Sequence, residues 1–171
     1  MTQRVFSSES VTCGHPDKVC DAVSDAIVDA CLAVDPNARV AVETCIKGMQ
    51  DKSVIILAGE VSLEGETPDY VAIAREAAAE IGYTSHDIGM DATTPALCDV
   101  LVYVTTQSAY INQGVDRDSV DSQGAGDQGI MFGFACMETE EFDELNGRFF
   151  PLAAALSQRL TRRMTNARKD G

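Results

Sequence analysis

The first long segment of the chain places apolar and polar residues with the period of an α-helix. Between Pro16 and about Val34, apolar side chains fall on one stripe, and Asp21, Asp25 and Asp29 lie on the opposite side. The stripe consists of Val19, Val23, Ala26, Ile27, Ala30, Cys31 and Val34. Proline suits the first helical position because its missing N–H would be unpaired there, and the Asp-Pro pair at 35–36 ends the pattern. The sequence predicts a helix over 16–34.

Three segments have the composition of β-strands. Arg39–Cys45 alternates apolar and polar residues, Ser53–Val61 contains a Val-Ile-Ile-Leu run, and Cys98–Thr106 is rich in valine and leucine. The residues between the first two, Lys47–Lys52, have the composition of a turn. We therefore expect a hairpin followed, much later in the chain, by a third strand.

Two further helices are predicted. One opens at Thr67-Pro68, has an apolar stripe from Val71 to Ile81, and meets Gly82 where a C-terminal cap belongs. The other covers Pro151–Lys169, with arginines crowded in its second half, where positive charge favours the helix dipole. The order α-β-β-α-β predicts a layered α/β (α+β) fold, a sheet with helices on one face.

Residues 107–129 show almost no apolar periodicity. A structureless stretch of about 20 residues inside a compact domain is typical of a lid, a binding loop or disorder. Residues 130–137 resume a short apolar run, and residues 138–144 form an acidic connector.

Composition and charge restrict the function. The 171 residues are 45% hydrophobic and carry a formal charge of −14. This charge argues against a general nucleic-acid binder and against an anionic membrane surface, because both need a basic face. A phosphate compound would have to be bridged by metal ions or by a few placed cations. No segment reaches 18 uninterrupted apolar residues, so the sequence predicts no membrane span. The N-terminus also lacks the apolar run of a signal peptide.

The six cysteines contain no C-x-x-C pair, and most stand inside apolar runs. This usage favours reduced, buried thiols over a metal site or disulfides, and so favours the cytoplasm.

Three features could carry chemistry. The first is Gly14–Lys18 (Gly-His-Pro-Asp-Lys) at a helix start, where free N–H groups favour an anion; the alternative is a plain helix cap. The second is Gly124–Gly129, which holds Asp127 between glycines but lacks the Lys-Ser/Thr of a P-loop; the alternative is a flexible turn. The third is Glu43 and Glu60 in apolar strands, which are cation ligands if they face a cleft and solvated side chains otherwise. His86 is expected to be a surface-loop residue.

Several motifs, in order along essentially the whole chain, together resemble the S-adenosylmethionine synthetase (methionine adenosyltransferase) family. They are Ser8–Val11, Gly14–Lys18, Asp87–Asp91, Ile111–Asp116, Gly124–Gly129 and Gly129–Ala135. The resemblance implies an enzyme that joins ATP and L-methionine and hydrolyses the released triphosphate to pyrophosphate and phosphate. It also implies two Mg²⁺ ions per site, K⁺, and an active site between the subunits of a homodimer or tetramer. Catalysis would come from aligning the sulfur, the carbon and the leaving oxygen, and from electrostatic stabilisation of the charged leaving group.

The family's catalytic and phosphate-contacting residues match four positions. The resemblance implies that His15 contacts the ATP phosphates and the departing oxygen, with Lys18 beside it. It further implies that Asp17 is an ATP-site magnesium ligand and that Asp127 contacts the substrates.

The remaining site residues follow from the same resemblance. Glu43 matches the family's potassium-site carboxylate, whereas Glu60 and Gln107 match residues that bind methionine. Residues 107 to about 117 match the mobile loop that gates the site, which agrees with their lack of periodicity. Ser108–Ile111 departs from the family's usual Ser-Pro-Asp-Ile, so an acidic loop residue is missing.

The resemblance also implies interleaved, repeated domains. Residues 1–12 would hold the first strand of an N-terminal domain, 13–106 the α/β domain with Gly14–Lys18, 107–129 the gating loop and glycine-rich motif, and 130–171 the truncated start of a further domain. Family chains are more than twice as long as this one. We therefore expect a fragment that is inactive alone. The alternative is a noncatalytic regulatory or interaction subunit that keeps the ligand-facing motifs.

Overall fold

The computed structural model describes residues 5–106 and 129–171. Its contacts divide the chain into two units. The larger unit is Pro16–Gly129, and the smaller unit combines Met1–His15 with Ile130–Gly171.

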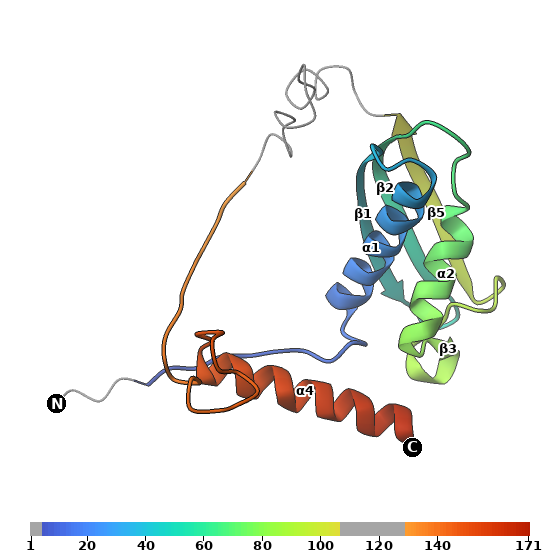
Figure 1. The fold of residues 1–171 in the computed structure, drawn as a ribbon. Helices are drawn as coiled ribbons and strands as arrows, with labels where there is room; N and C mark the ends of the chain where they lie inside the picture. The colour runs from blue at the N-terminus through green and yellow to red at the C-terminus, as the bar shows by residue number, and fades with distance from the viewer. Residues whose placement is uncertain (1–4, 107–128) are drawn as a thin grey trace, which may run out of the picture. The chain divides into compact units, whose positions relative to one another are not determined.

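A three-stranded sheet forms the centre of the larger unit (Figure 1). Strand β1 (Arg39–Gly48) pairs antiparallel with β2 (Ser53–Ser62), and β2 pairs parallel with β5 (Cys98–Thr106), in the order β1-β2-β5. A parallel pair needs a crossover connection, and helix α2 (Tyr70–Ile81) lies within it.

Helices α1 (Pro16–Val34) and α2 lie side by side on one face of this sheet (Figure 1). Residues of β2 alternate between the two faces, so Ser53, Ile55 and Leu57 are buried beneath the helices. The helices contribute their apolar stripes to the same core: Val19, Val23, Ile27, Cys31, Ala74 and Ala78. The predicted fold class, α+β with helices on one face, is confirmed.

In the larger unit, the predicted bounds differ from the observed ones by more than one residue in two places. Strand β1 continues to Gly48, because Lys47 and Gly48 pair with the first residues of β2, and the turn is narrowed to 49–52. Helix α2 begins at Tyr70 rather than Thr67, because the Asp69 side chain caps it by accepting hydrogen bonds from the N–H groups of residues 71 and 72. Gly82 is the C-terminal cap, as predicted.

A small element between α2 and β5 was not predicted. Strands β3 (Thr84–Ser85) and β4 (Met90–Asp91) pair around the 3₁₀ helix η1 (His86–Ile88). Two-residue strands have no detectable periodicity, so the sequence pattern could not indicate them. His86 is half-buried, with its Nε2 atom 2.8 Å from the carbonyl oxygen of Gln50, and is therefore more than a surface-loop residue.

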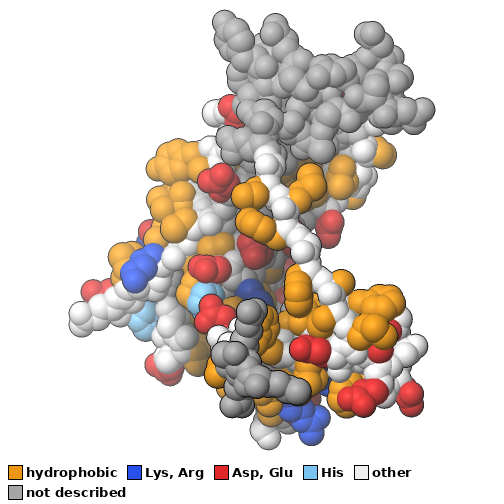
Figure 2. Space-filling view, turned by 90° about the vertical axis from the view of Figure 1, so that its left-hand side faces the viewer, with side chains coloured by type: hydrophobic (Ala, Val, Ile, Leu, Met, Phe, Trp, Pro, Cys, Tyr) orange, Lys and Arg blue, Asp and Glu red, His pale blue; other side chains and the backbone are white. Residues whose placement is uncertain are grey.

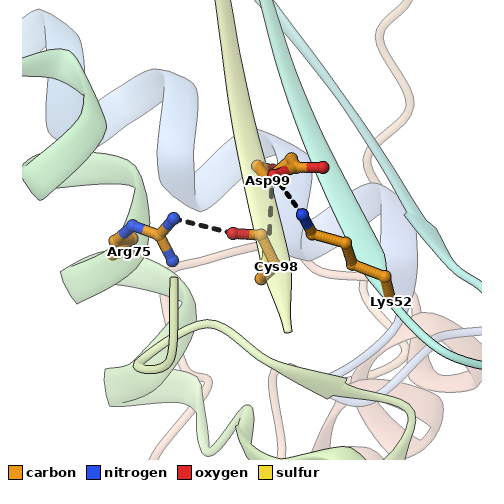
Figure 3. Close-up of polar contacts among 4 residues, drawn as sticks. All are labelled: Lys52, Arg75, Cys98 and Asp99. Atoms are coloured by element: carbon orange, nitrogen blue, oxygen red, sulfur yellow. Dashed lines mark hydrogen bonds and ion pairs between the residues drawn. The ribbon is translucent and has the colours of Figure 1, made fainter. Parts of the chain in front are cut away.

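The start of β5 is held by two basic side chains (Figure 3). The Arg75 guanidinium on α2 donates to the carbonyl oxygens of Ala92 (2.8 Å) and Cys98 (2.7 Å). On the other side, Lys52 forms an ion pair of 2.6 Å with Asp99. These contacts tie β5 to α2 and to the end of the hairpin turn.

The smaller unit is built around helix α4 (Leu152–Asp170), one residue offset from its predicted range. Thr161 of this helix lies 3.2 Å from Ser10, oxygen to oxygen, so the N-terminal segment runs beside α4. Residues 5–12 contain no strand, in contrast to the expectation for 1–12. Residues 130–137 are extended, and their large apolar side chains are strongly exposed.

The cysteines are all free thiols. Only Cys31 and Cys98 are buried, and Cys45 is exposed, so the expectation that most are buried is wrong. Cys45 belongs to the outward-facing residues of a strand, a position that an apolar neighbourhood in the sequence does not reveal. In the described part of the chain, no helix has the length and apolar character needed to span a bilayer.

Candidate functional site

The start of α1 presents two of the expected site residues. Asp17 and Lys18 occupy its first turn and are exposed, so both are accessible to a ligand. His15 stands immediately before the helix, half-buried, and its backbone N–H donates to the carbonyl of Thr12 at 3.1 Å. An acidic side chain in a first turn is favoured by the helix dipole, which also favours a bound anion.

Glu43 and Glu60 share one face of the sheet. In the β1–β2 ladder Glu43 is opposite Ala58 and Glu60 is opposite Ala41, so the two glutamates are diagonal neighbours, about 7–8 Å apart. Their face is the one away from the core residues Ile55 and Leu57. Glu43 is exposed and Glu60 is half-buried. The register thus brings together a predicted potassium ligand and a predicted methionine ligand.

A glycine sets the distance between the strands at this point. Gly59 has a φ of +152°, and a Cβ atom added to it would lie 1.9 Å from the carbonyl oxygen of Ala41. Ala41 is the residue opposite Glu60. Only glycine permits this close backbone approach, which places Glu60 against β1. Sequence reasoning did not single out Gly59, although its place just before a glutamate in a strand was the available signal.

Two expected site residues, Gln107 and Asp127, lie outside the described residues, as do most of the predicted gating loop and glycine-rich motif. The described strand β5 ends at Thr106, and its neighbour Thr105 pairs with Glu60. The described part of β5 therefore ends at the same end of the sheet as Glu60.

The described residues supply carboxylates but no complete metal cage. Among them, no three His, Cys, Asp or Glu side chains gather into a group that could hold a metal ion. Asp17 and Glu43 carry the hard oxygen donors that Mg²⁺ and K⁺ accept. The donor type therefore fits both ions, but other ligands, such as phosphate oxygens or water, must complete each coordination shell.

An open pocket of about 340 Å³ lies where β2 and β5 end, beside the start of α2. Its lining includes Ser62, Thr67, Tyr70 and Thr106. Burial raises the pKa of Tyr70 to about 12, so its hydroxyl stays protonated at neutral pH. No sequence motif indicated this pocket, because its residues come from three separate elements.

The smaller unit contains one contact with a bearing on chemistry. The Arg168 guanidinium, near the end of α4, lies 3.8 Å from the sulfur of Cys13. Cys13 is two residues before His15 in the sequence. Burial works to raise the pKa of the Cys13 thiol, but hydrogen bonds from Thr165 and Arg168 and the charge of Lys169 bring it below the ordinary value. This pairing joins residues far apart in sequence, so no local pattern could predict it.

The chain is similar to proteins of one family along its whole length. Residues 3–109 match the family model described as S-adenosylmethionine synthetase, N-terminal domain, and residues 122–171 match that of the central domain. The S-adenosylmethionine synthase of Brachyspira hyodysenteriae is 49% identical over 173 residues, covering 96% of this chain and 40% of that protein. That of Salinispora arenicola is 47% identical, covering 100% of this chain and 42% of its own length. The chain thus spans about two fifths of the relatives that it matches.

Proposed function

The chain belongs to the S-adenosylmethionine synthetase family, and from this membership we propose that it carries the N-terminal share of a site that makes S-adenosylmethionine from ATP and L-methionine. The observation that carries the proposal is that Glu43 and Glu60 are diagonal neighbours on one sheet face, in a chain whose helix α1 also starts on an accessible Asp-Lys pair. The Asp-Lys pair lies in one of the family motifs, and the resemblance implies a ligand-binding role for each of the two glutamates.

The proposed reaction is a nucleophilic substitution. The methionine sulfur forms a bond to the ribose 5′ carbon, the bond from that carbon to the triphosphate oxygen breaks, and the triphosphate leaves with the electron pair. Water then divides the triphosphate into pyrophosphate and phosphate. Sulfur is already a good nucleophile, so the protein's task is to align the reacting atoms and to stabilise the charge of the leaving group.

The phosphate end of ATP is assigned to the region around α1. His15 donates a hydrogen bond to the departing oxygen, and Lys18 adds positive charge near the phosphates. Asp17 would hold Mg²⁺, which when bound offsets the triphosphate charge. Asp127 contacts the substrates from the glycine-rich segment. This arrangement explains how a chain with a charge of −14 can accept a polyphosphate.

The methionine end is assigned to the open sheet face. The Glu60 carboxylate pairs with the substrate ammonium group, Gln107 adds a hydrogen bond, and Glu43 would hold K⁺ beside them. Closure of the segment 107 to about 117 excludes water, so that the sulfonium product and the triphosphate are not lost to side reactions.

We further propose that the complete site forms between two subunits of a homodimer or tetramer in the cytoplasm. The 171 residues match about two fifths of each relative, so the contributions of the remaining length are missing from them. We expect no turnover by this chain alone.

The test measures S-adenosylmethionine formed from ATP, methionine, Mg²⁺ and K⁺. The arms are this chain alone, this chain with the remaining part of a relative added as a separate polypeptide, and the mixture with His15→Asn. Product in the second arm only, abolished by the substitution, supports the proposal. Stable binding to the added part without any product, even when the two parts are covalently joined, would instead favour a noncatalytic interaction subunit.

A further inference from the structure

An arginine groove lies in the smaller unit, outside every residue assigned above to adenosyl transfer. It has a volume of about 380 Å³ and is open to solvent. We define the arginine groove by the residues Glu144, Arg148, Arg159, Arg162, Arg163 and Asn166. Four arginines and one glutamate give this lining a formal charge of +3, in a chain whose total is −14.

Three of the groove's arginines lie on one face of helix α4. Arg159, Arg162, Arg163 and Asn166 are spaced at i, i+3, i+4 and i+7, so their side chains project to the same side. The helix dipole does not account for them, because it acts on the last turn, where Arg168 and Lys169 stand.

Acidic partners do not account for them either. The only acidic residue of α4 is Asp170. Arg159 pairs with Glu144 at 2.7 Å, with both side chains largely exposed. Among the described residues, no ion pair is found for Arg148, Arg162 or Arg163. The groove therefore holds concentrated positive charge that the fold does not neutralise.

The fourth arginine is held in place by its backbone. The Glu140 carboxylate accepts hydrogen bonds from the N–H groups of Gly147 (2.9 Å) and Phe149 (2.8 Å), the two neighbours of Arg148. The side-chain amide of Asn146 donates to the Glu140 carbonyl at 2.6 Å. Arg148 thus stands in a loop anchored on both sides, facing the helical stripe across the groove.

We propose that the arginine groove binds a short, multiply charged phosphate anion of the pyrophosphate or triphosphate class. Guanidinium groups match phosphate oxygens with paired, charge-assisted hydrogen bonds. The helix rises about 1.5 Å per residue, so Arg159 and Arg163 are offset by about 6 Å, a span that two linked phosphates can bridge.

The surroundings of the groove favour a short anion over a long one. A second open pocket, of about 390 Å³, shares Arg159 and Glu144 with the groove, and Glu141 and Asp143 line it. A nucleic acid or an acidic peptide that extended past Arg159 would meet these carboxylates. A ligand confined to the groove avoids them. Figure 2 draws one face of the molecule, with acidic side chains scattered over it and few basic ones, in keeping with the total charge of −14.

The test is titration calorimetry of the whole 171-residue chain with sodium pyrophosphate and sodium tripolyphosphate, without divalent metal, at low and moderate salt. We expect saturable binding that weakens with salt. Arg162→Gln combined with Arg163→Gln should weaken it about tenfold or more, because two charge-assisted contacts are lost.

Two matched variants make the result specific. Arg168→Gln with Lys169→Gln removes the same charge from the same helix outside the groove, and His15→Asn with Lys18→Gln removes the phosphate contacts proposed for ATP. The first variant should bind pyrophosphate within about twofold of the wild type, because neither of its residues lines the groove. The second should lose only binding at the proposed ATP phosphate site and keep the binding at the groove. An equal loss in the 168/169 variant would overturn the proposal without bearing on adenosyl transfer. A loss confined to the 15/18 variant would also overturn it, and would assign the binding to the proposed ATP phosphate site.

Helicity measured by circular dichroism checks the folding of each variant. If the double substitution in α4 does not fold, Arg148→Gln in the anchored loop takes its place, with several-fold weaker binding expected. Binding of a long acidic peptide or an oligonucleotide, with no binding of pyrophosphate, would contradict the assignment of a short anion.

Discussion

Glu43 on β1 and Glu60 on β2 are diagonal neighbours on the same face of one antiparallel ladder, with only alanines directly opposite them. Two carboxylates so placed repel each other unless a cation lies between or beside them. Nothing in the linear sequence states this relationship, because the residues are joined through a turn and the pairing register decides their faces. The register therefore turns two isolated glutamates into one candidate cation and ammonium site.

Substitution of Glu43 separates its ionic role from its structural one. Because the side chain is exposed, Glu43→Gln should change the free energy of unfolding by less than about 0.5 kcal/mol. In the complete protein or the reconstituted mixture, the same change should abolish the dependence of S-adenosylmethionine formation on K⁺. Retained K⁺ activation in this variant would remove Glu43 from the cation site.

Gly59 should tolerate no side chain. Gly59→Ala places a Cβ atom against the Ala41 carbonyl oxygen at a positive φ, so we expect a loss of about 2–3 kcal/mol in the free energy of unfolding. Gly133→Ala is the matched control, because an added Cβ there meets nothing within 4 Å. Urea titrations of both variants give the comparison. Equal stability of the two would show that β1 and β2 can separate at no cost.

Arg75 should matter far more than Lys52. The half-buried guanidinium donates to two backbone carbonyls, and Arg75→Ala would leave both without their partner, at about 1.5–3 kcal/mol. Lys52 pairs with Asp99 at an exposed position, and Lys52→Ala should cost less than about 1 kcal/mol. Both basic residues hold the start of β5 (Figure 3), so denaturant unfolding of the two variants ranks the contacts directly.

The pH dependence of stability should have a contribution from Asp91. Hydrogen bonds from the side chains and backbone N–H groups of Thr93 and Thr94 hold the pKa of the Asp91 carboxyl below its usual range. The lowered pKa stabilises the fold fully above the unfolded value of about 3.9. The stabilisation is lost as the pH falls through the lower folded value.

Thermal unfolding between pH 6 and pH 2.5 tests this contribution. Wild-type protein should lose more stability over the acidic part of the range than Asp91→Asn, which has no charge to lose. Parallel curves for the two proteins would show that Asp91 contributes nothing to acid unfolding.

Thiol chemistry should distinguish Cys13 from the buried cysteines. The pKa of Cys13 is lowered, whereas burial raises that of Cys31 and Cys98. At pH 7, iodoacetamide should therefore modify Cys13 well before the other two, as peptide mass mapping would record. Arg168→Gln with Lys169→Gln should slow the modification of Cys13 specifically. An unchanged rate would show that these cations do not activate the thiol.

Periodicity was enough to predict α1 and β5 to the residue, because each has a long, uninterrupted pattern and a clear boundary signal at Pro16, Asp35 or Cys98. Periodicity misplaced the start of α2. The start depends on which of several polar side chains accepts hydrogen bonds from the first N–H groups of the helix, and Asp69 does so rather than Thr67. The strands of the β3–β4 pair are too short to have a period at all.

The candidate site divides in the same way. A single motif pointed to His15, Asp17 and Lys18 because they are neighbours in sequence. Glu43 and Glu60 were predicted one at a time, as carboxylates in apolar strands and from the family resemblance. The features that depend on contacts between residues far apart in the sequence were not predicted. These include the shared face of the two glutamates, the approach of Gly59 to Ala41, and the contact between Cys13 and Arg168.

The parallel ladder that joins Ser53 to Cys98 also orders the folding of the larger unit. Strand β2 gains its second neighbour only after α2 and the β3–β4 pair have been synthesised, and until then its far edge offers unpaired N–H and C=O groups. That edge belongs to the most apolar strand of the sheet. A chain whose synthesis stops before Thr106 would keep an unpaired, apolar strand edge that can associate with other chains. Pairing of β5 with β2 is therefore the folding step that protects newly made copies from aggregation.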